Sequence, residues 1–153
     1  MYAPMLCLAK GYIDLHSAPS TPTMPPLSFK RLYSYFLTAI TMAMGTALLY
    51  SGVVGTFIDT LGWAKGFGMP TATEETAVLF ASATGRNLGA GFFVWTQILR
   101  GDKRMLGMFM ICWAWAGVAD CMILWRHPDG QNVTKHMVNT VLAPTFGILL
   151  IRS

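Results

Sequence analysis

The chain has 153 residues, of which 54% are hydrophobic and only 12% are charged, and its mean hydropathy is +0.47. Soluble domains usually carry about a quarter charged residues, so this composition excludes an ordinary soluble domain. The net charge of +4 is too small and too dispersed for a nucleic-acid-binding protein, and basic residues that flank membrane spans explain it better. We therefore expect an integral membrane protein that has the lipid bilayer as its partner and does not bind nucleic acid.

The first part of the chain, residues 1–29, is expected to form a disordered, flexible N-terminal tail. The Pro/Ser/Thr-rich stretch 18–26 has no helical periodicity, and no long apolar run follows a basic start as in a signal peptide. Three cysteines do not make a disulfide framework, and we expect Cys7, Cys112 and Cys121 to be ordinary apolar residues.

The remainder, residues 30–153, predicts one all-α domain, an integral membrane four-helix bundle. About 20 apolar residues cross the hydrocarbon core of a bilayer. Four runs approach this length, at about 32–55, 76–99, 105–125 and 134–151. The amphipathic segment 62–70 is expected to form an interfacial turn or short helix, and Thr71 or Thr73 to cap the second span. The short basic turn after the second span predicts that the second and third helices are antiparallel neighbours.

The basic residues indicate an orientation in the membrane. Six of them fall on one predicted side: Lys30, Arg31, Arg100, Lys103, Arg104 and Arg152. By the positive-inside rule both termini should be cytoplasmic, and the endoplasmic reticulum is the expected membrane.

Arg86 lies near the middle of the second span, where an arginine costs about 2.5–3.5 kcal/mol on insertion scales. A residue that costly should face the bundle interior and have a partner, and Asp120 is the only acid inside another span. At the helical rise, Arg86 lies about 16 Å from Glu75 at the membrane rim, and Asp120 lies about 9 Å from Arg126 at the same rim. Helical side chains lean toward their own N-terminus, which closes most of this difference. The sequence therefore predicts an Arg86–Asp120 ion pair.

Further polar and aromatic residues at this depth predict a pocket around the pair. The catalytic candidates are Asp120, Arg86, His136 and His127. The candidate substrate contacts are Asn87, Trp113, Trp115, Asn139 and Glu75, with the tryptophans as deeper walls. No metal site is expected, because the histidines and aspartate lack metal-ligand spacing.

Several of these residues also have a structural interpretation. Gly85 and Gly89 form a Gly-x-x-x-Gly pattern, which is typical of helix packing in membranes, so we expect them to contact a neighbouring helix. The Arg86–Asp120 pair can equally serve to fix the register of two helices. His127 is most simply a rim residue in a turn.

Four short motifs resemble the domain-of-unknown-function family 4267. They are Phe67-Gly68-Met69-Pro70, Gly85-Arg86-Asn87-Leu88-Gly89, Ala119-Asp120 and His136. The resemblance covers roughly residues 32–152 and implies a small four-helix membrane protein, distantly similar to DoxX-like proteins. That family often has aspartate after the arginine, where this chain has Asn87, so a second carboxylate is not carried over. Fungal relatives often occur in secondary-metabolite gene clusters, which implies a role in natural-product biosynthesis.

Two classes of function follow. The first is a membrane enzyme that isomerises or cyclises a lipophilic intermediate, such as a terpenoid or polyketide, by proton transfer. Asp120 or His136 would be the general acid or base, and Arg86 would hold Asp120 ionised or stabilise an oxyanion. The faces of Trp113 and Trp115 would stabilise a carbocation. Since nothing suggests a nucleotide, haem or flavin site, this enzyme is expected to be cofactor-free.

The second class is non-catalytic: a membrane scaffold, a lipophile-binding protein or a transport-accessory protein that associates with other biosynthetic enzymes. In either class, four short spans enclose a narrow interior. The site is therefore expected in a groove of one chain or at a homodimer interface.

Overall fold

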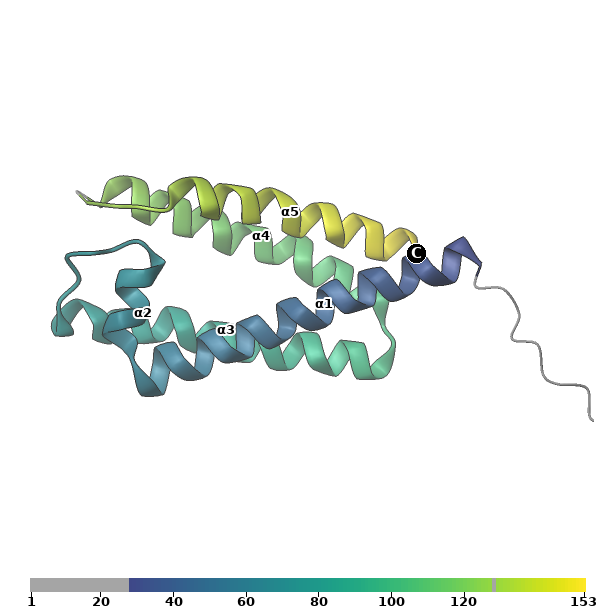
Figure 1. The fold of residues 1–153 in the computed structure, drawn as a ribbon, viewed down its shortest axis with the longest axis horizontal. Helices are drawn as coiled ribbons and strands as arrows, with labels where there is room; N and C mark the ends of the chain where they lie inside the picture. Colours follow the sequence, from purple (N-terminus) through teal and green to yellow (C-terminus); the bar gives the residue numbers. More distant parts are fainter. Residues whose placement is uncertain (1–27, 128) are drawn as a thin grey trace, which may run out of the picture.

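The fold is taken from a computed structural model that describes residues 28–127 and 129–153 (Figure 1). The helices are α1 (Phe29–Val53), its π-helical continuation η1 (Val54–Ile58), α2 (Thr60–Phe67), α3 (Glu74–Arg100), α4 (Lys103–Arg126) and α5 (Val133–Arg152). No strand occurs in these two ranges, so the all-α prediction is confirmed. The predicted tail lies outside the described residues up to position 27, as does Cys7, and α1 already begins at Phe29.

Local chemistry sets the helix ends close to their predicted positions. Thr73 caps α3 in a capping box with Thr76, whose Oγ1 accepts a hydrogen bond of 2.9 Å from the Thr73 backbone N–H. α3 ends at Gly101 in a left-handed conformation (φ 69°), and the Asp102 carboxylate then caps α4 by accepting from Met105 N at 3.0 Å. The predicted segment 62–70 contributes to a short helix, α2, rather than an open turn.

The long helices are arranged as two pairs, α1 with α3 and α4 with α5 (Figure 1). Small residues bring each pair into close contact. An added Cβ at Gly52 in α1 would lie 2.6 Å from the backbone N of Leu88 in α3. In the other pair, an added Cβ at Gly147 in α5 would lie 2.6 Å from the carbonyl oxygen of Gly107 in α4. Backbones that approach this closely leave room only for glycine.

Two packing predictions are corrected by this arrangement. α3 and α4 run antiparallel, but each lies mainly along another helix and they contact one another only locally. The Gly-x-x-x-Gly motif does not form the predicted packing contact: Gly85 has only Thr56 Oγ1 at 4.0 Å from its would-be Cβ, and Gly89 has nothing within 4 Å. The glycine of α3 that packs is Gly91, whose Cβ would lie 2.7 Å from Leu49 of α1.

The two pairs meet at both ends of the molecule. At the end that carries the C-terminus, five buried side chains form a core: Leu37, Val94, Leu106, Met110 and Leu150. At the other end, the C-terminal end of α2 is hydrogen-bonded to the segment that precedes α5. The backbone N–H of Gln131 donates to Gly68 O at 2.9 Å, and Asn132 Nδ2 donates to Gly66 O at 3.4 Å. Over the whole molecule, the two pairs make far fewer contacts with each other than the helices make within each pair.

Two helical segments, Phe29–Ile58 and Lys103–Arg126, are long and apolar enough to cross a membrane. In the most apolar stretch of each segment, only 28% and 17% of the residues, respectively, are buried within the structure. Most of this apolar surface is therefore not covered by the described part of the chain itself.

Candidate functional site

Arg86 and Asp120 form the predicted ion pair between α3 and α4. Arg86 Nη2 donates to Asp120 Oδ1 at 2.7 Å, which is a short, charge-assisted hydrogen bond. The Arg86 side chain is 40% exposed and that of Asp120 is 18% exposed. The pair is therefore open on one side rather than sealed in the core.

An apolar groove of about 410 Å³ surrounds this pair and is called the ion-pair groove below. Its walls come from three elements, with Phe67 at the end of α2, Leu79 and Phe80 on α3, and Ile123 on α4. The volume lies within the range of about 300–1,000 Å³ that is usual for small-molecule sites. A charged pair at the edge of an apolar groove can orient the polar part of a lipophilic molecule.

Trp113 connects the ion pair to a second space. Arg86 Cζ lies 5.9 Å from the centroid of the Trp113 ring, in cation–π range, and Phe109 stacks with the same ring at 5.4 Å. Trp113 also lines a cavity of about 340 Å³ between α1, α4 and α5, together with Met44 and Asn139. Trp113 and Asn139 therefore line the same cavity, and the Trp113 ring also lies within cation–π distance of Arg86.

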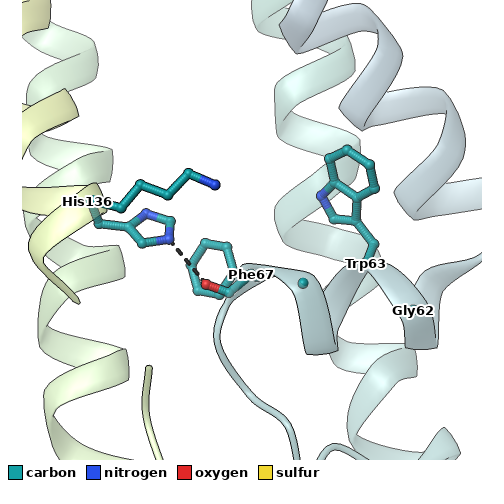
Figure 2. Close-up of a pocket in the computed structure, with 6 residues that line it drawn as sticks. Gly62, Trp63, Phe67 and His136 are labelled. Atoms are coloured by element: carbon teal, nitrogen blue, oxygen red, sulfur yellow. Dashed lines mark hydrogen bonds between the residues drawn. The ribbon is translucent and has the colours of Figure 1, made fainter. Parts of the chain in front are cut away.

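His136 lies in a third space, called the Trp63–His136 cavity, of about 420 Å³. Its Nε2 donates to the carbonyl oxygen of Phe67 at 3.1 Å, and its ring centroid lies 4.4 Å from that of Phe67 (Figure 2). Because a carbonyl oxygen only accepts, Nε2 carries the hydrogen and Nδ1 is left as the acceptor of the neutral ring. Phe67 borders both this cavity and the ion-pair groove, but no hydrogen bond links His136 to Asp120.

The other four predicted site residues line none of these three spaces. Asn87 Nδ2 donates to Ser51 Oγ at 3.2 Å, so this side chain faces α1 instead. Trp115 is 75% exposed and cannot be an inner wall. Glu75 is exposed in the first turn of α3. His127 follows the end of α4, where its Nδ1 is buried without a hydrogen-bond partner among the described residues. The single polar pocket that the sequence predicted is thus divided among three cavities.

Three residues that line these spaces were not among the predicted site residues: Phe67, Trp63 and Lys135. The available signals were the position of Phe67 in a motif shared with the family and the position of Lys135 beside His136. In residues 28–127 and 129–153, no group of three or more His, Cys, Asp or Glu side chains is placed to hold a metal ion. Cys112 and Cys121 are both free thiols.

These features define an all-α protein of paired helices that has two helices able to cross a membrane and an ion pair in an apolar groove. The model of the family Domain of unknown function (DUF4267) matches residues 45–150, so the chain belongs to this family. Neither a search of curated proteins nor a search of solved structures finds a match to this chain. The predicted family is confirmed.

Proposed function

We propose that this chain is a four-span membrane protein that binds a lipophilic biosynthetic intermediate in the ion-pair groove and isomerises it by proton transfer at Asp120. The spans would be α1, α3, α4 and α5, which have 25, 27, 24 and 20 residues. At the helical rise the shortest is about 30 Å long, which equals the thickness of a bilayer's hydrocarbon core.

The uncovered apolar surface supports the membrane part of this proposal. Large apolar side chains are exposed on all four long helices, among them Phe36 (56%), Leu99 (81%), Trp115 (75%) and Val141 (65%). Extended apolar surface of this kind marks contact with lipid or with another protein. The predicted basic side also agrees with the fold, because the start of α1, the α3–α4 turn and the C-terminus lie at one end of the molecule (Figure 1).

The observation that carries the catalytic part is the open ion pair in an apolar groove. Asp120 Oδ1 is held by Arg86, whereas Oδ2 accepts no hydrogen bond from any described residue. In an ion pair with a guanidinium, the carboxyl group is present as a carboxylate, so it has no proton to donate at the start of a reaction. The geometry therefore favours proton abstraction over the protonation of an alkene or epoxide, and isomerisation over cyclisation.

The reaction can be written for a lipophilic ketone or enone of terpenoid or polyketide type. Asp120 Oδ2 takes a proton from the carbon next to the carbonyl, and the C–H electron pair passes into an enolate. The remaining N–H groups of Arg86 stabilise the enolate oxygen. The protonated Asp120 then returns the proton to a different carbon, which shifts the double bond without net oxidation or reduction. His136 has no direct part in these steps, since it lies in the other cavity beyond Phe67.

The test is the substitution Asp120→Asn, with Glu75→Gln as a matched control because Glu75 is an exposed acid on α3. The substrate would be the intermediate that accumulates when the gene is deleted. Removing a general base should lower turnover by about 10²–10⁴-fold at unchanged protein level in the membrane. Because Asp120 returns the proton that it took, a substrate deuterated next to the carbonyl should carry deuterium at the new C–H. Unchanged turnover by the Asp120→Asn variant would overturn the proposal.

A non-catalytic role is the second candidate, and one observation favours it. The ion pair joins α3 to α4 where the two helical pairs otherwise touch only locally, so it can serve assembly. A scaffold, a lipophile-binding protein or a transport accessory would need no chemistry at Asp120. In that case Asp120→Asn and Arg86→Lys would both lower the amount of inserted protein, and the remaining protein would keep its specific activity in the pathway.

A further inference from the structure

We propose that the Trp63–His136 cavity binds the anionic head group, a carboxylate or a phosphate, of an amphiphilic molecule whose apolar body lies along Trp63 and Phe67. This site is separate from the ion-pair groove, and its test does not depend on the proposed isomerisation. The charge, rigidity and shape of the cavity support this assignment.

The polar lining of the cavity is basic. Lys135 and His136 line it, and no aspartate or glutamate does. Lys135 forms no ion pair or hydrogen bond with any residue that the structure describes, so the three N–H donors of its ammonium group are available to a ligand. The nearby Asp59 carboxylate is engaged elsewhere, because it accepts from Gly62 N at 2.7 Å and caps α2. An anion in this cavity therefore meets a cation without a competing side-chain carboxylate in the lining.

The walls of the cavity are held in place before any ligand binds. The His136 ring is fixed by the Phe67 carbonyl, and the Phe67 ring packs edge-on against Phe80 with centroids 4.9 Å apart. The Trp63 ring is held by Tyr50, with centroids 5.9 Å apart and planes at 70°. Figure 2 shows Phe67 between His136 and Trp63, with the His136 ring directed at the Phe67 carbonyl. A site with walls fixed in this way loses little conformational freedom on binding.

The floor of the cavity on the α2 side is bare backbone at Gly62 and Gly66. An added Cβ at Gly66 would meet nothing within 4 Å, so open space lies beside the helix at this position. At Gly62 an added Cβ would instead collide with the Asp59 carboxylate. Gly66 is therefore a position where a larger side chain can enter the cavity without disturbing the fold.

The position of the cavity at the α2 end of the molecule suits an amphiphile. This end lies opposite the C-terminus (Figure 1), and Trp and Lys side chains typically reach the head-group level of a membrane. An anionic head group can come from a free amphiphilic acid or from an anionic phospholipid, and both offer the Lys135 ammonium group a negatively charged acceptor.

The experiment uses the full chain in phosphatidylcholine nanodiscs and measures quenching of tryptophan fluorescence by three brominated probes. The probes are dibromostearate, brominated phosphatidylglycerol and brominated phosphatidylcholine. We expect saturable quenching by at least one anionic probe, with the saturable part lost in Trp63→Phe. Saturation by dibromostearate alone identifies a free acid as the ligand, and saturation by phosphatidylglycerol identifies a lipid head group.

Three variants make the result specific. Lys135→Gln should raise the half-saturating concentration by about tenfold, as expected for loss of a charged hydrogen bond. Lys65→Gln, an exposed lysine of α2 that does not line the cavity, should leave it unchanged. Gly66→Leu should abolish saturable quenching by filling the space. Equal quenching by phosphatidylcholine, or no effect of Lys135→Gln and Gly66→Leu in folded protein, would overturn the proposal.

Discussion

At the scale of single residues, the stability provided by the Arg86–Asp120 pair can be measured separately from its chemistry. Removing one partner leaves an unpaired charge beside apolar side chains, whereas replacing both leaves an apolar contact. Loss of one partner from a fully buried pair costs about 3–5 kcal/mol. Because the Arg86 side chain is 40% exposed in the structure, we expect a smaller loss of about 1–3 kcal/mol for Asp120→Leu.

The double variant Arg86→Met with Asp120→Leu should recover most of that loss in a thermal-unfolding experiment in detergent. Ser82→Ala is a suitable control in the same groove, since the Ser82 hydroxyl bonds only to Leu79 O of its own helix. If the double variant loses as much stability as the two single variants together, the residues are not energetically coupled.

The ion pair was predictable because the sequence offers only one possible acidic partner for Arg86. An intramembrane arginine requires a partner, and the sequence offers one acid within the other spans, Asp120. The partner of the adjacent residue Asn87 was not predictable in the same way. Successive helical residues point about 100° apart, so Asn87 faces a different neighbour from Arg86. Only the position of α1, which the sequence does not specify, shows that this neighbour is Ser51.

At the scale of the helices, their extents were predictable and their partners were not. The length of an apolar run and the caps at its ends are local properties, so the ends of α3 and α4 differ by only a few residues from the predicted spans. Pairing depends on which small residues meet in three dimensions. The sequence pointed to Gly85 and Gly89, but the close contacts of the α1–α3 pair fall at Gly52 and Gly91.

This difference gives a matched prediction for the α1–α3 pair. Gly52→Ala should destabilise the protein by about 1–3 kcal/mol, because the new methyl group would lie 2.6 Å from Leu88 N and must push the helices apart. Gly89→Ala should be neutral or stabilising by up to about 1 kcal/mol, because nothing lies within 4 Å and alanine favours the helix. Thermal unfolding of both variants in one detergent makes the comparison. Equal destabilisation by the two variants would contradict the close contact of α1 and α3 at Gly52.

A second prediction concerns the junction between α2 and the start of α5. Gly68 has φ 133°, a conformation that L-residues rarely adopt, and an added Cβ there would collide with the carbonyl oxygen of Gln131. Gly68→Ala should therefore destabilise the protein by at least about 1–2 kcal/mol. It should also speed hydrogen exchange of the Gln131 N–H, which now donates to Gly68 O. Gly66→Ala, two residues earlier in open space, should leave that exchange rate unchanged.

At the scale of the whole molecule, pairing of the helices explains why one predicted pocket became three cavities. Four short helices around a single axis would leave one narrow interior. Two pairs that meet at their ends instead leave separate spaces, of about 340 Å³, 410 Å³ and 420 Å³. Residues at one predicted depth, such as Asp120 and His136, therefore lie in different spaces. Depth along a helix can be predicted from sequence, whereas its rotation depends on the partner helix.

The proposed four-span topology predicts on which side of the membrane each turn lies. With the three native cysteines replaced by alanine, single cysteines would be introduced at Arg100 and Ser153, and at Thr71 and Asp129. The first two positions lie at the end of the molecule that carries the C-terminus, and the second two flank the far ends of α3 and α4 (Figure 1). A membrane-impermeant maleimide applied to sealed vesicles should label the cysteines of one pair of positions, either 100 and 153 or 71 and 129. The cysteines of the other pair should stay unlabelled.

Permeabilising the vesicles should expose the unlabelled pair, and this provides the control for cysteine reactivity. By the positive-inside rule, the positions next to the basic end should be the cytoplasmic ones. Labelling of all four positions from one side would contradict the four-span topology, and the exposed apolar faces would then have to be covered by protein partners. Labelling that separates Arg100 from Ser153 would mean that only one of α4 and α5 crosses the membrane, and this result would also contradict the four-span topology.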